Sequence, residues 1–463
     1  MKSAISQSTR EFIEVKKYNW SKLVTSLAVI VILVARGWGS QSRVDWEDTF
    51  GIGLTLSKGF AAIWSPNNYG IFIARVMQIL IAQFPLEYLP KTIFIFATVF
   101  WITNLIVIYS AITRTTQKKS FASLVVVGLA LLPTPVIGGQ GVIQGSWWLQ
   151  TFTLMVVLAA FPSLEQKGKL GIFVLVFTAV TVASFPVGIC LAFPIVLRLV
   201  GRRQSFTKWH ASLLGAFFLG SAYQIFTFFR RTSLMNYLGE WTPNQRNEKD
   251  ALNIWSETSA IGIRDIPKIS IEELPKSIYI SIKSIYSELL PDPFSVLIHG
   301  EQSWVMTLLT MLSVLIFIYF IAMAFRSSKN DKIKGFIGRI TFYLFPIFIF
   351  QFATAGTLNV FQYANLFDMT FIVVISGMIV FSIDNKKYTI LPLTLVITTL
   401  FVVSSIQQFR DPIRYGSGWA KGYKAAKFEC NQQGPDEVVV IVQGDSGSHQ
   451  LLSPIGIRCK DLR

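Results

Sequence analysis

The chain has 463 residues, of which 52% are hydrophobic and only 15% are charged, and its net charge is +16. Soluble domains carry about 25% charged residues, so repeated long apolar runs in such a chain indicate a multi-pass membrane protein. The Lys and Arg residues form short clusters between the apolar runs, as in cytoplasmic membrane loops, which argues against nucleic-acid binding. Motifs of ATPases, dehydrogenases, α/β-hydrolases and zincins are absent from the sequence, and its Cys and His residues form no zinc-binding pattern.

The apolar pattern predicts an all-α polytopic membrane protein with about 11 transmembrane helices. Residues 1–21 are polar and basic, so we expect a cytoplasmic N-terminus and a retained signal-anchor in a bacterial plasma membrane. Residues 22–406 form the membrane domain, and every predicted cytoplasmic loop carries at least two Lys or Arg. The predicted spans are about 22–36, 92–112, 120–136, 144–162, 169–185, 187–200, 208–229, 303–325, 340–356, 367–383 and 389–406.

The first outer loop, 37–90, contains two apolar stretches at 51–64 and 69–84. Each is shorter than the roughly 20 residues that a spanning helix needs. We therefore predict interfacial or re-entrant helices. The alternative is a hairpin of two short spans, which would leave every later loop on the same side of the membrane. Helical spacing in the second stretch gives one largely apolar face, which consists of Ile71, Ala74, Met77, Gln78 and Ile81.

Two further regions are predicted on the outer face. The large loop 230–302 contains an amphipathic stretch, 269–290, that is typical of a helix on a membrane surface. The extracytoplasmic C-terminal segment 407–463 is predicted to be a small α/β tail with a strand at 437–443. A disulfide between Cys430 and Cys459 is permitted there, and two free thiols are an equal alternative. Because polar residues collect on this face, we expect function there.

The most informative stretch is Val44-Asp45-Trp46-Glu47-Asp48, directly after the first predicted span. Three carboxylates in five positions near a membrane surface suggest a catalytic base among Asp45, Glu47 and Asp48. Neighbouring carboxylates can also share a proton or hold a divalent cation. The alternative is a solvated loop in which Asp48 caps a helix that begins near Thr49.

Cations and aromatic residues of the outer regions are candidates for substrate binding. Arg230 and Arg231 depart from the bias of basic residues toward the cytoplasm, so they suit either a substrate phosphate or lipid headgroups. Arg75 interrupts an apolar stretch and needs a partner, for which the acidic cluster is the candidate. Amide and aromatic side chains at the outer ends of spans suit a carbohydrate, although Trp147 also fits an interfacial aromatic belt; these residues are Gln144, Trp147 and Tyr363.

This layout resembles the glycosyltransferase C superfamily: an acidic motif in the first extracytoplasmic loop, then short interfacial helices and many spans. The stretches 69–85, 144–148 and 419–430 with the following strand are also similar to bacterial membrane proteins of this type. The resemblance implies a polyprenyl-phosphate sugar donor and a glycan, lipid or protein acceptor. It also implies a base in the first loop, with Asp45 ahead of Glu47 and Asp48. The family's Asp-Asp or Asp-Glu pair is replaced here by Asp-Trp-Glu-Asp.

Two other functions fit the same layout. A transporter or flippase of lipid-linked saccharides would have charged residues within its spans and internal repeats. The sequence has few charged residues within the predicted spans and no convincing repeat. A polysaccharide polymerase or ligase shares the donor class and an arginine-rich outer loop. We favour a glycosyltransferase in cell-envelope polysaccharide biosynthesis, because that function gives the acidic cluster a catalytic role.

Overall fold

The computed structural model describes residues 20–38, 44, 48, 51–53, 55–56, 59–64, 71–132, 143, 146–161, 168–201, 206–229, 332–354, 361–384, 418–441 and 455–462. This part of the chain is mostly helical. Its elements are α2 (Trp20–Gly37), η2 (Gly59–Trp64), α4 (Phe72–Ile81), η3 (Leu86–Tyr88), α5 (Leu89–Thr116), α6 (Lys119–Leu131), α7 (Ser146–Ala160), α8 (Gly168–Ser184), η5 (Pro186–Leu191), α9 (Ala192–Gly201), α10 (Lys208–Phe229), α16 (Lys332–Thr354), α17 (Phe361–Asp384), α19 (Gly418–Cys430), β1 (Val438–Ile441), β2 (Ile455–Arg458) and α20 (Cys459–Leu462).

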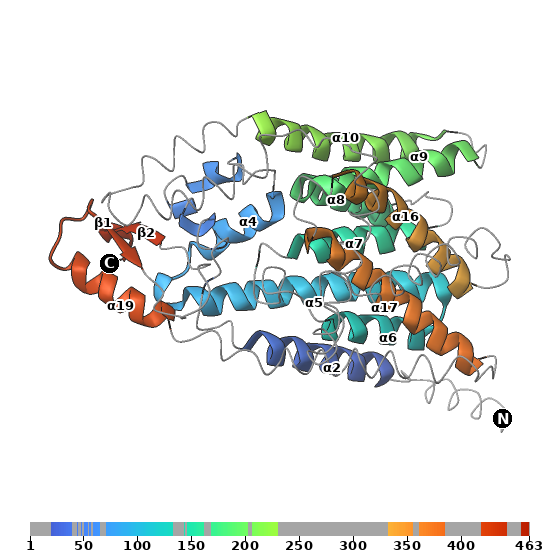
Figure 1. Cartoon of the computed structure of the whole chain (residues 1–463), viewed down its shortest axis with the longest axis horizontal. Helices are drawn as coiled ribbons and strands as arrows, with labels where there is room; N and C mark the ends of the chain where they lie inside the picture. The colour runs from blue at the N-terminus through green and yellow to red at the C-terminus, as the bar shows by residue number, and fades with distance from the viewer. Residues whose placement is uncertain are drawn as a thin grey trace, which may run out of the picture.

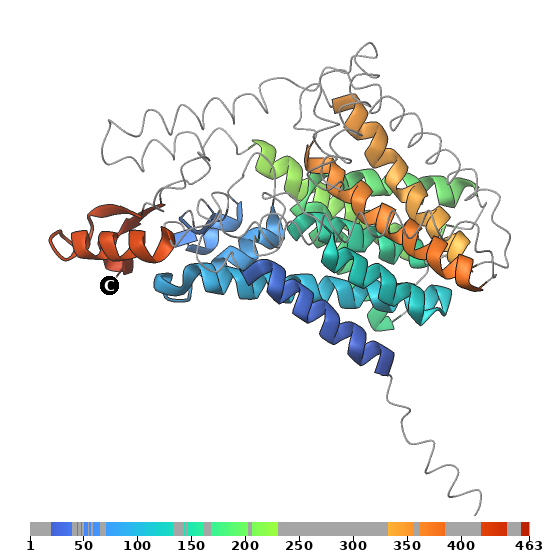
Figure 2. The same cartoon turned by 60° about the horizontal axis from the view of Figure 1, so that its bottom comes forward.

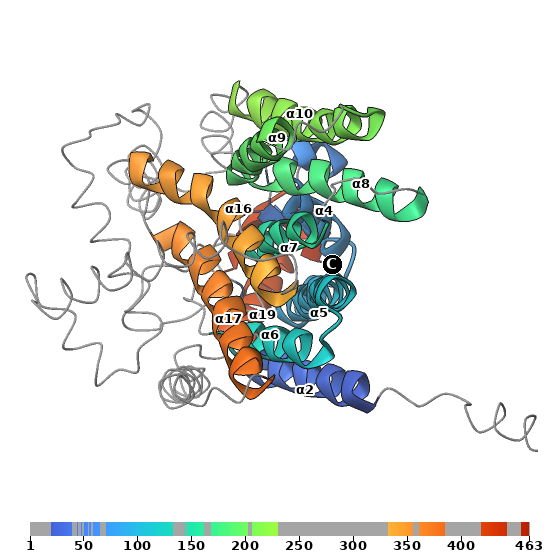
Figure 3. The same cartoon turned by 90° about the vertical axis from the view of Figure 1, so that its right-hand side faces the viewer.

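The long helices form one bundle with α5 and α7 packed together at its centre (Figure 3). Helices α8 and α10 pack on one side of this pair, and α6 and α2 on the other. Helices α16 and α17 pack on each other and cover the flank formed by α6 and α7. The short helix α4 lies at the end of the bundle that is nearer to α19, β1 and β2 (Figures 1 and 2).

Most described helices coincide with predicted spans. The predicted span 208–229 is α10, and 169–185 differs from α8 by one residue at each end. The helix that corresponds to the span predicted at 340–356 starts earlier, because α16 begins at Lys332 and includes three basic residues that were assigned to a loop. Lys and Arg are good helix formers, so a charged stretch can continue a helix beyond its apolar part. The spans predicted at 303–325 and 389–406 lie outside the described residues.

The number of membrane spans stays a prediction. Within the described ranges, one helix, Leu86–Thr116, is long and apolar enough to cross a membrane by length and composition. Seven shorter apolar helices of 10–17 residues accompany it. The apolar stretch 69–84 forms the 10-residue helix α4, in line with the expectation of a short, non-spanning helix.

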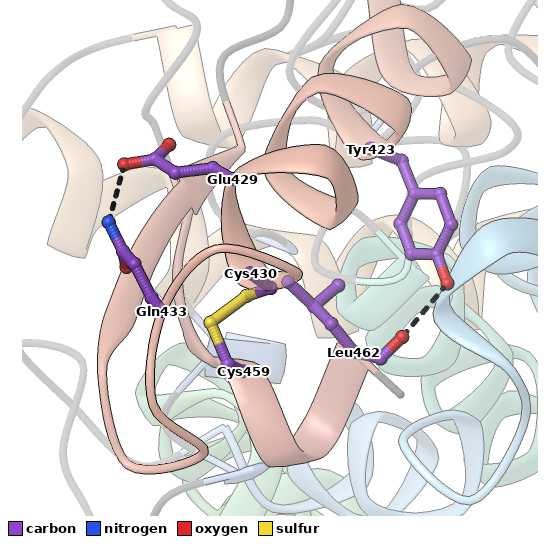
Figure 4. Close-up of a disulfide and its surroundings, with 6 residues drawn as sticks. All are labelled: Tyr423, Glu429, Cys430, Gln433, Cys459 and Leu462. Atoms are coloured by element: carbon purple, nitrogen blue, oxygen red, sulfur yellow. Dashed lines mark hydrogen bonds between the residues drawn. A yellow bond between two sulfur atoms is a disulfide. The ribbon is translucent and has the colours of Figure 1, made fainter.

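The C-terminal elements form a small module closed by a disulfide. Strands β1 and β2 pair antiparallel with Val439 opposite Ile457, and Cys430 at the end of α19 is bonded to Cys459 at the start of α20 (Figure 4). The structure thus decides between the two alternatives for these cysteines. Strand β1, Val438–Ile441, lies within the predicted strand 437–443, whereas β2 was not predicted because Ile-Gly-Ile-Arg is short and contains a glycine.

This module is attached to the end of the first predicted outer loop. The indole Nε1 of Trp419 donates a hydrogen bond of 2.8 Å to the Leu86 carbonyl, across 333 positions of sequence. Tyr423, on the same buried face of α19, donates a weak hydrogen bond of 3.5 Å to the Leu462 carbonyl. Burial, together with the negative charge of Glu87, raises the pKa of the Tyr423 phenol. The first outer loop and the C-terminal segment, which were both predicted on the outer face of the membrane, are therefore in contact.

Candidate functional site

Asp48 lies buried at the end of the bundle, with no exposed surface. Its Oδ1 accepts a hydrogen bond of 3.3 Å from Nε2 of Gln78, and its Oδ2 accepts one of 2.9 Å from the backbone N–H of Ile143. Two N–H donors directed at the two oxygens favour the ionised carboxylate, which only accepts hydrogen bonds. The alternative of a solvated loop is therefore wrong for Asp48, because the side chain connects three separate segments away from water.

Arg75 belongs to the same network. It lies in the first turn of α4 with no exposed surface, and its Nη1 donates a hydrogen bond of 2.9 Å to Oε1 of Gln78. Since Gln78 also bonds Asp48, its amide connects a buried guanidinium to a buried carboxylate. A buried cation requires such compensation, because the cost of removing it from water is several kcal/mol. The structure therefore places Arg75 near Asp48, with Gln78 between them.

The first outer loop packs closely enough to require a glycine. A Cβ atom on Gly51 would overlap Oε1 of Gln78, so any side chain there would displace the amide. Val44 and Ile52 have no exposed surface, and the buried Thr55 hydroxyl donates a hydrogen bond of 2.8 Å to the Gly51 carbonyl. The described parts of this loop are thus anchored on both sides of Asp48.

Trp147 and Trp148 lie next to this network, at the start of α7. Phe185 packs against both indoles, with ring centroids 5.4 Å from Trp147 and 4.4 Å from Trp148. The preceding residue, Ser184, accepts a hydrogen bond of 3.0 Å from the backbone N–H of Ile73, just before Arg75. Trp147 is 5% exposed, so the interpretation of a lipid-facing aromatic belt is wrong for it; the indole is buried between α7 and α8.

Helix α10 completes this end of the bundle. The Gln224 amide donates hydrogen bonds of 3.0 and 2.8 Å to the carbonyls of Val182 and Ala183, at the end of α8. Tyr223 donates one of 2.5 Å to the Ile63 carbonyl of η2, and its ring packs edge-on against Phe72 of α4. Five segments therefore meet around the network: the first loop, α4, the residues before α7, the end of α8, and α10.

Several predicted site residues lie outside the described part of the chain: Asp45, Glu47, Gln144, Arg230 and Arg231. Tyr363 belongs to α17, but its side chain is not described. Among the residues that the structure does describe, no three His, Cys, Asp or Glu are grouped to hold a metal ion. The main residue that sequence reasoning missed is Gln78, which it treated as one member of a helix face. The available signal was an amide within an apolar helix, three positions after an arginine.

Comparisons with known proteins gave structural matches alone: no protein-family model and no curated protein matches the chain. Three matching solved structures are of the oligosaccharyltransferase of Archaeoglobus fulgidus. One is tethered to an acceptor peptide (TM-score 0.48), one is in complex with an inhibitory peptide and a dolichol-phosphate (0.46), and one is the apo form (0.47). Each is 13% identical and covers 91% of this chain.

The matching enzyme is of the glycosyltransferase C superfamily, which is the superfamily that the sequence motifs resemble. This chain spans 58–59% of the length of the solved chains. At 13% identity and with TM-scores below 0.5, the similarity assigns no residue of this chain a role.

Proposed function

We propose that this protein is a membrane glycosyltransferase that transfers a sugar from a polyprenyl-phosphate donor to an extracytoplasmic acceptor. The observation that carries the proposal is the buried Asp48–Gln78–Arg75 network at the meeting point of five segments. A network that includes two buried charged groups is costly to keep, because both groups must be removed from water.

The proposed reaction needs a base and a cation. A carboxylate of the first outer loop, Asp45 ahead of Glu47 and Asp48, takes the proton from an acceptor hydroxyl. The acceptor oxygen then bonds to the anomeric carbon as the bond from that carbon to the phosphate oxygen breaks. The lipid phosphate leaves with its electron pair, and arginine stabilises its charge.

The remaining assignments belong to the same proposal. Arg75, Arg230 and Arg231 supply positive charge for the lipid phosphate, and Gln144 and Tyr363 contact the sugar. Trp147 was a further candidate from the sequence, but its indole is buried, so it is not assigned a contact with the sugar. A divalent cation is a further candidate partner of the acidic cluster, and no step of the transfer is assigned to it. The acceptor is a cell-envelope glycan, a lipid or a protein in a bacterial plasma membrane. A polymerase or ligase would use the same donor chemistry and differ in its product.

One observation favours the alternative of a transporter for lipid-linked saccharides. Asp368 lies in the second turn of α17 and has no exposed surface. An ionisable side chain within an apolar helix is a candidate for a substrate or ion pathway. The two functions differ in chemistry, because a transporter returns its saccharide intact on the other side of the membrane.

The test is a transfer assay with the purified protein in lipid nanodiscs, supplied with labelled polyprenyl-phosphate sugars. We expect release of polyprenyl phosphate, and a fall in rate of about 100-fold or more when Asp45, Glu47 and Asp48 are replaced together by their amides. The control is Asp436→Asn, since Asp436 is 83% exposed in the C-terminal module. Intact donor with every sugar tested, together with movement of labelled saccharide across vesicles, would overturn the proposal in favour of a transporter.

A further inference from the structure

We infer that Asp48 is a fixed anchor of the acidic loop rather than its base, and that Gln78 is a positioning residue that holds Asp48 and Arg75 in one arrangement. The inference rests on the proposed function, because the group being positioned is the reacting carboxylate. It assigns the proton transfer to Asp45 or Glu47, and it gives α4 a role in holding the site.

The burial of Asp48 excludes it from direct contact with an acceptor. A general base must come within about 2.6–3.2 Å of the proton that it removes, directly or through one water. Asp48 has no exposed surface from which an acceptor hydroxyl could approach, and each of its oxygens accepts a hydrogen bond from the protein. Arg75 is equally buried, so it acts on a donor phosphate through its charge rather than by direct contact.

The chemistry of the amide is the second argument. A guanidinium only donates hydrogen bonds and an ionised carboxylate only accepts them. The Gln78 amide meets both demands by presenting its oxygen to Arg75 and its nitrogen to Asp48. Rotating the amide by half a turn would place donor against donor and acceptor against acceptor. Its orientation is thus determined by its partners, and Gly51 lies so close to the amide that a Cβ atom at position 51 would overlap it.

Sequence position is the third argument. Val44 and Asp48, both without exposed surface, are the described neighbours of Asp45 and Glu47 along the chain. The hydrogen bonds of Asp48 therefore restrain the backbone within three residues of the proposed base. A misplacement of about 1 Å at a reacting group can lower a rate about 100-fold, which makes such an anchor valuable.

An exchange of two side chains tests the inference. In Asp48→Asn, the new amide NH2 faces either Gln78 Nε2 or the Ile143 N–H, so a donor always meets a donor. In the double variant Asp48→Asn/Gln78→Glu, the amide introduced at position 48 accepts from Ile143 and donates to the carboxylate introduced at position 78. That carboxylate also accepts from Arg75. Every hydrogen bond is restored, but the negative charge has moved from position 48 to position 78.

We expect Asp48→Asn to lower kcat about 100-fold with little change in KM, and the double variant to recover to within about fivefold of the wild-type kcat. Both values are measured well below the Tm of each variant, so that loss of fold does not contribute. A double variant whose Tm recovers while kcat stays at the level of Asp48→Asn would overturn the inference, because Asp48 itself would then be the base. Wild-type kcat in Asp48→Asn would overturn it as well.

Thermal stability separates this inference from the proposed function. Whatever the reaction, the anchor predicts that Tm falls in Asp48→Asn, falls in Gln78→Glu, and returns toward the wild-type value when the two are combined. If the wild-type protein transfers no sugar but this pattern of Tm is found, the proposed function fails and the anchor stands. Additive losses of Tm in the double variant would contradict the anchor itself.

Discussion

Two arginines, at opposite ends of α7, show two ways of holding a guanidinium inside this protein. Arg75 bonds a side-chain amide that leads to a carboxylate, and it has no exposed surface. Arg198 is partly buried and bonds neutral groups of the other end: the carbonyls of Leu158 and Phe161, at 3.4 and 3.0 Å, and the Tyr343 hydroxyl, at 2.7 Å.

The difference lies in what each arrangement accomplishes. The last carbonyls of a helix have no partner within the helix and carry partial negative charge, so Arg198 satisfies a structural need of α7. Arg339 does the same with the Ala159 carbonyl. The network of Arg75 instead joins a side-chain amide to a buried carboxylate, and well-packed apolar residues could replace such a buried pair without loss of stability. This contrast is why function is assigned to the end of the bundle with Asp48.

Replacing each arginine by methionine is expected to give the largest difference between the two ends of the bundle. Arg75→Met leaves the Asp48 carboxylate buried without its compensating charge, so we expect a loss of about 3–5 kcal/mol of unfolding free energy and loss of transfer. Arg198→Met loses hydrogen bonds to carbonyls worth about 1–3 kcal/mol and keeps the site, so transfer persists. Denaturant unfolding in detergent and the transfer assay measure both. Equal loss of activity in the two variants would remove the distinction.

Two neighbouring glycines provide a smaller and cleaner test. In Gly51→Ala the new methyl group would overlap Gln78 Oε1, so the amide must shift. We expect a cost of about 1–3 kcal/mol in stability, as for other overpacked sites, and a lower transfer rate. Gly53→Ala is the matched control, because nothing lies within 4 Å of the position that its Cβ atom would take. Thermal unfolding and initial rates measured side by side check both, and equal effects at the two positions would contradict the close packing of Gln78.

Tyr343→Phe is expected to have the smallest effect. It removes the hydroxyl that accepts a hydrogen bond from Arg198 but keeps the ring, over which the guanidinium lies at 5.8 Å. Hydrogen bonds between membrane helices contribute about 0.6 kcal/mol on average, so a small fall in Tm and an unchanged transfer rate are expected. A large loss of transfer would mean that the Arg198 end also takes part in function.

The sequence predicted the helices of the bundle better than it predicted the site. Apolar runs bounded by basic residues define a helix such as α10 by local composition alone, and the buried face of α4 followed from helical spacing. The partners of Gln78 depend on Asp48, 30 positions earlier, and no local pattern encodes such a contact. The pairing of Cys430 with Cys459 was undecided for the same reason, because sequence separation says nothing about proximity.

The most direct test compares kcat for the variant Asp45→Asn/Glu47→Gln with kcat for the double variant Asp48→Asn/Gln78→Glu, at saturating polyprenyl-phosphate sugar. We expect Asp45→Asn/Glu47→Gln to be inactive, because both candidate bases are lost, and Asp48→Asn/Gln78→Glu to be active, because the anchor is rebuilt. An active Asp45→Asn/Glu47→Gln variant beside an inactive but stably folded Asp48→Asn/Gln78→Glu variant would contradict the inference and make Asp48 the catalytic carboxylate.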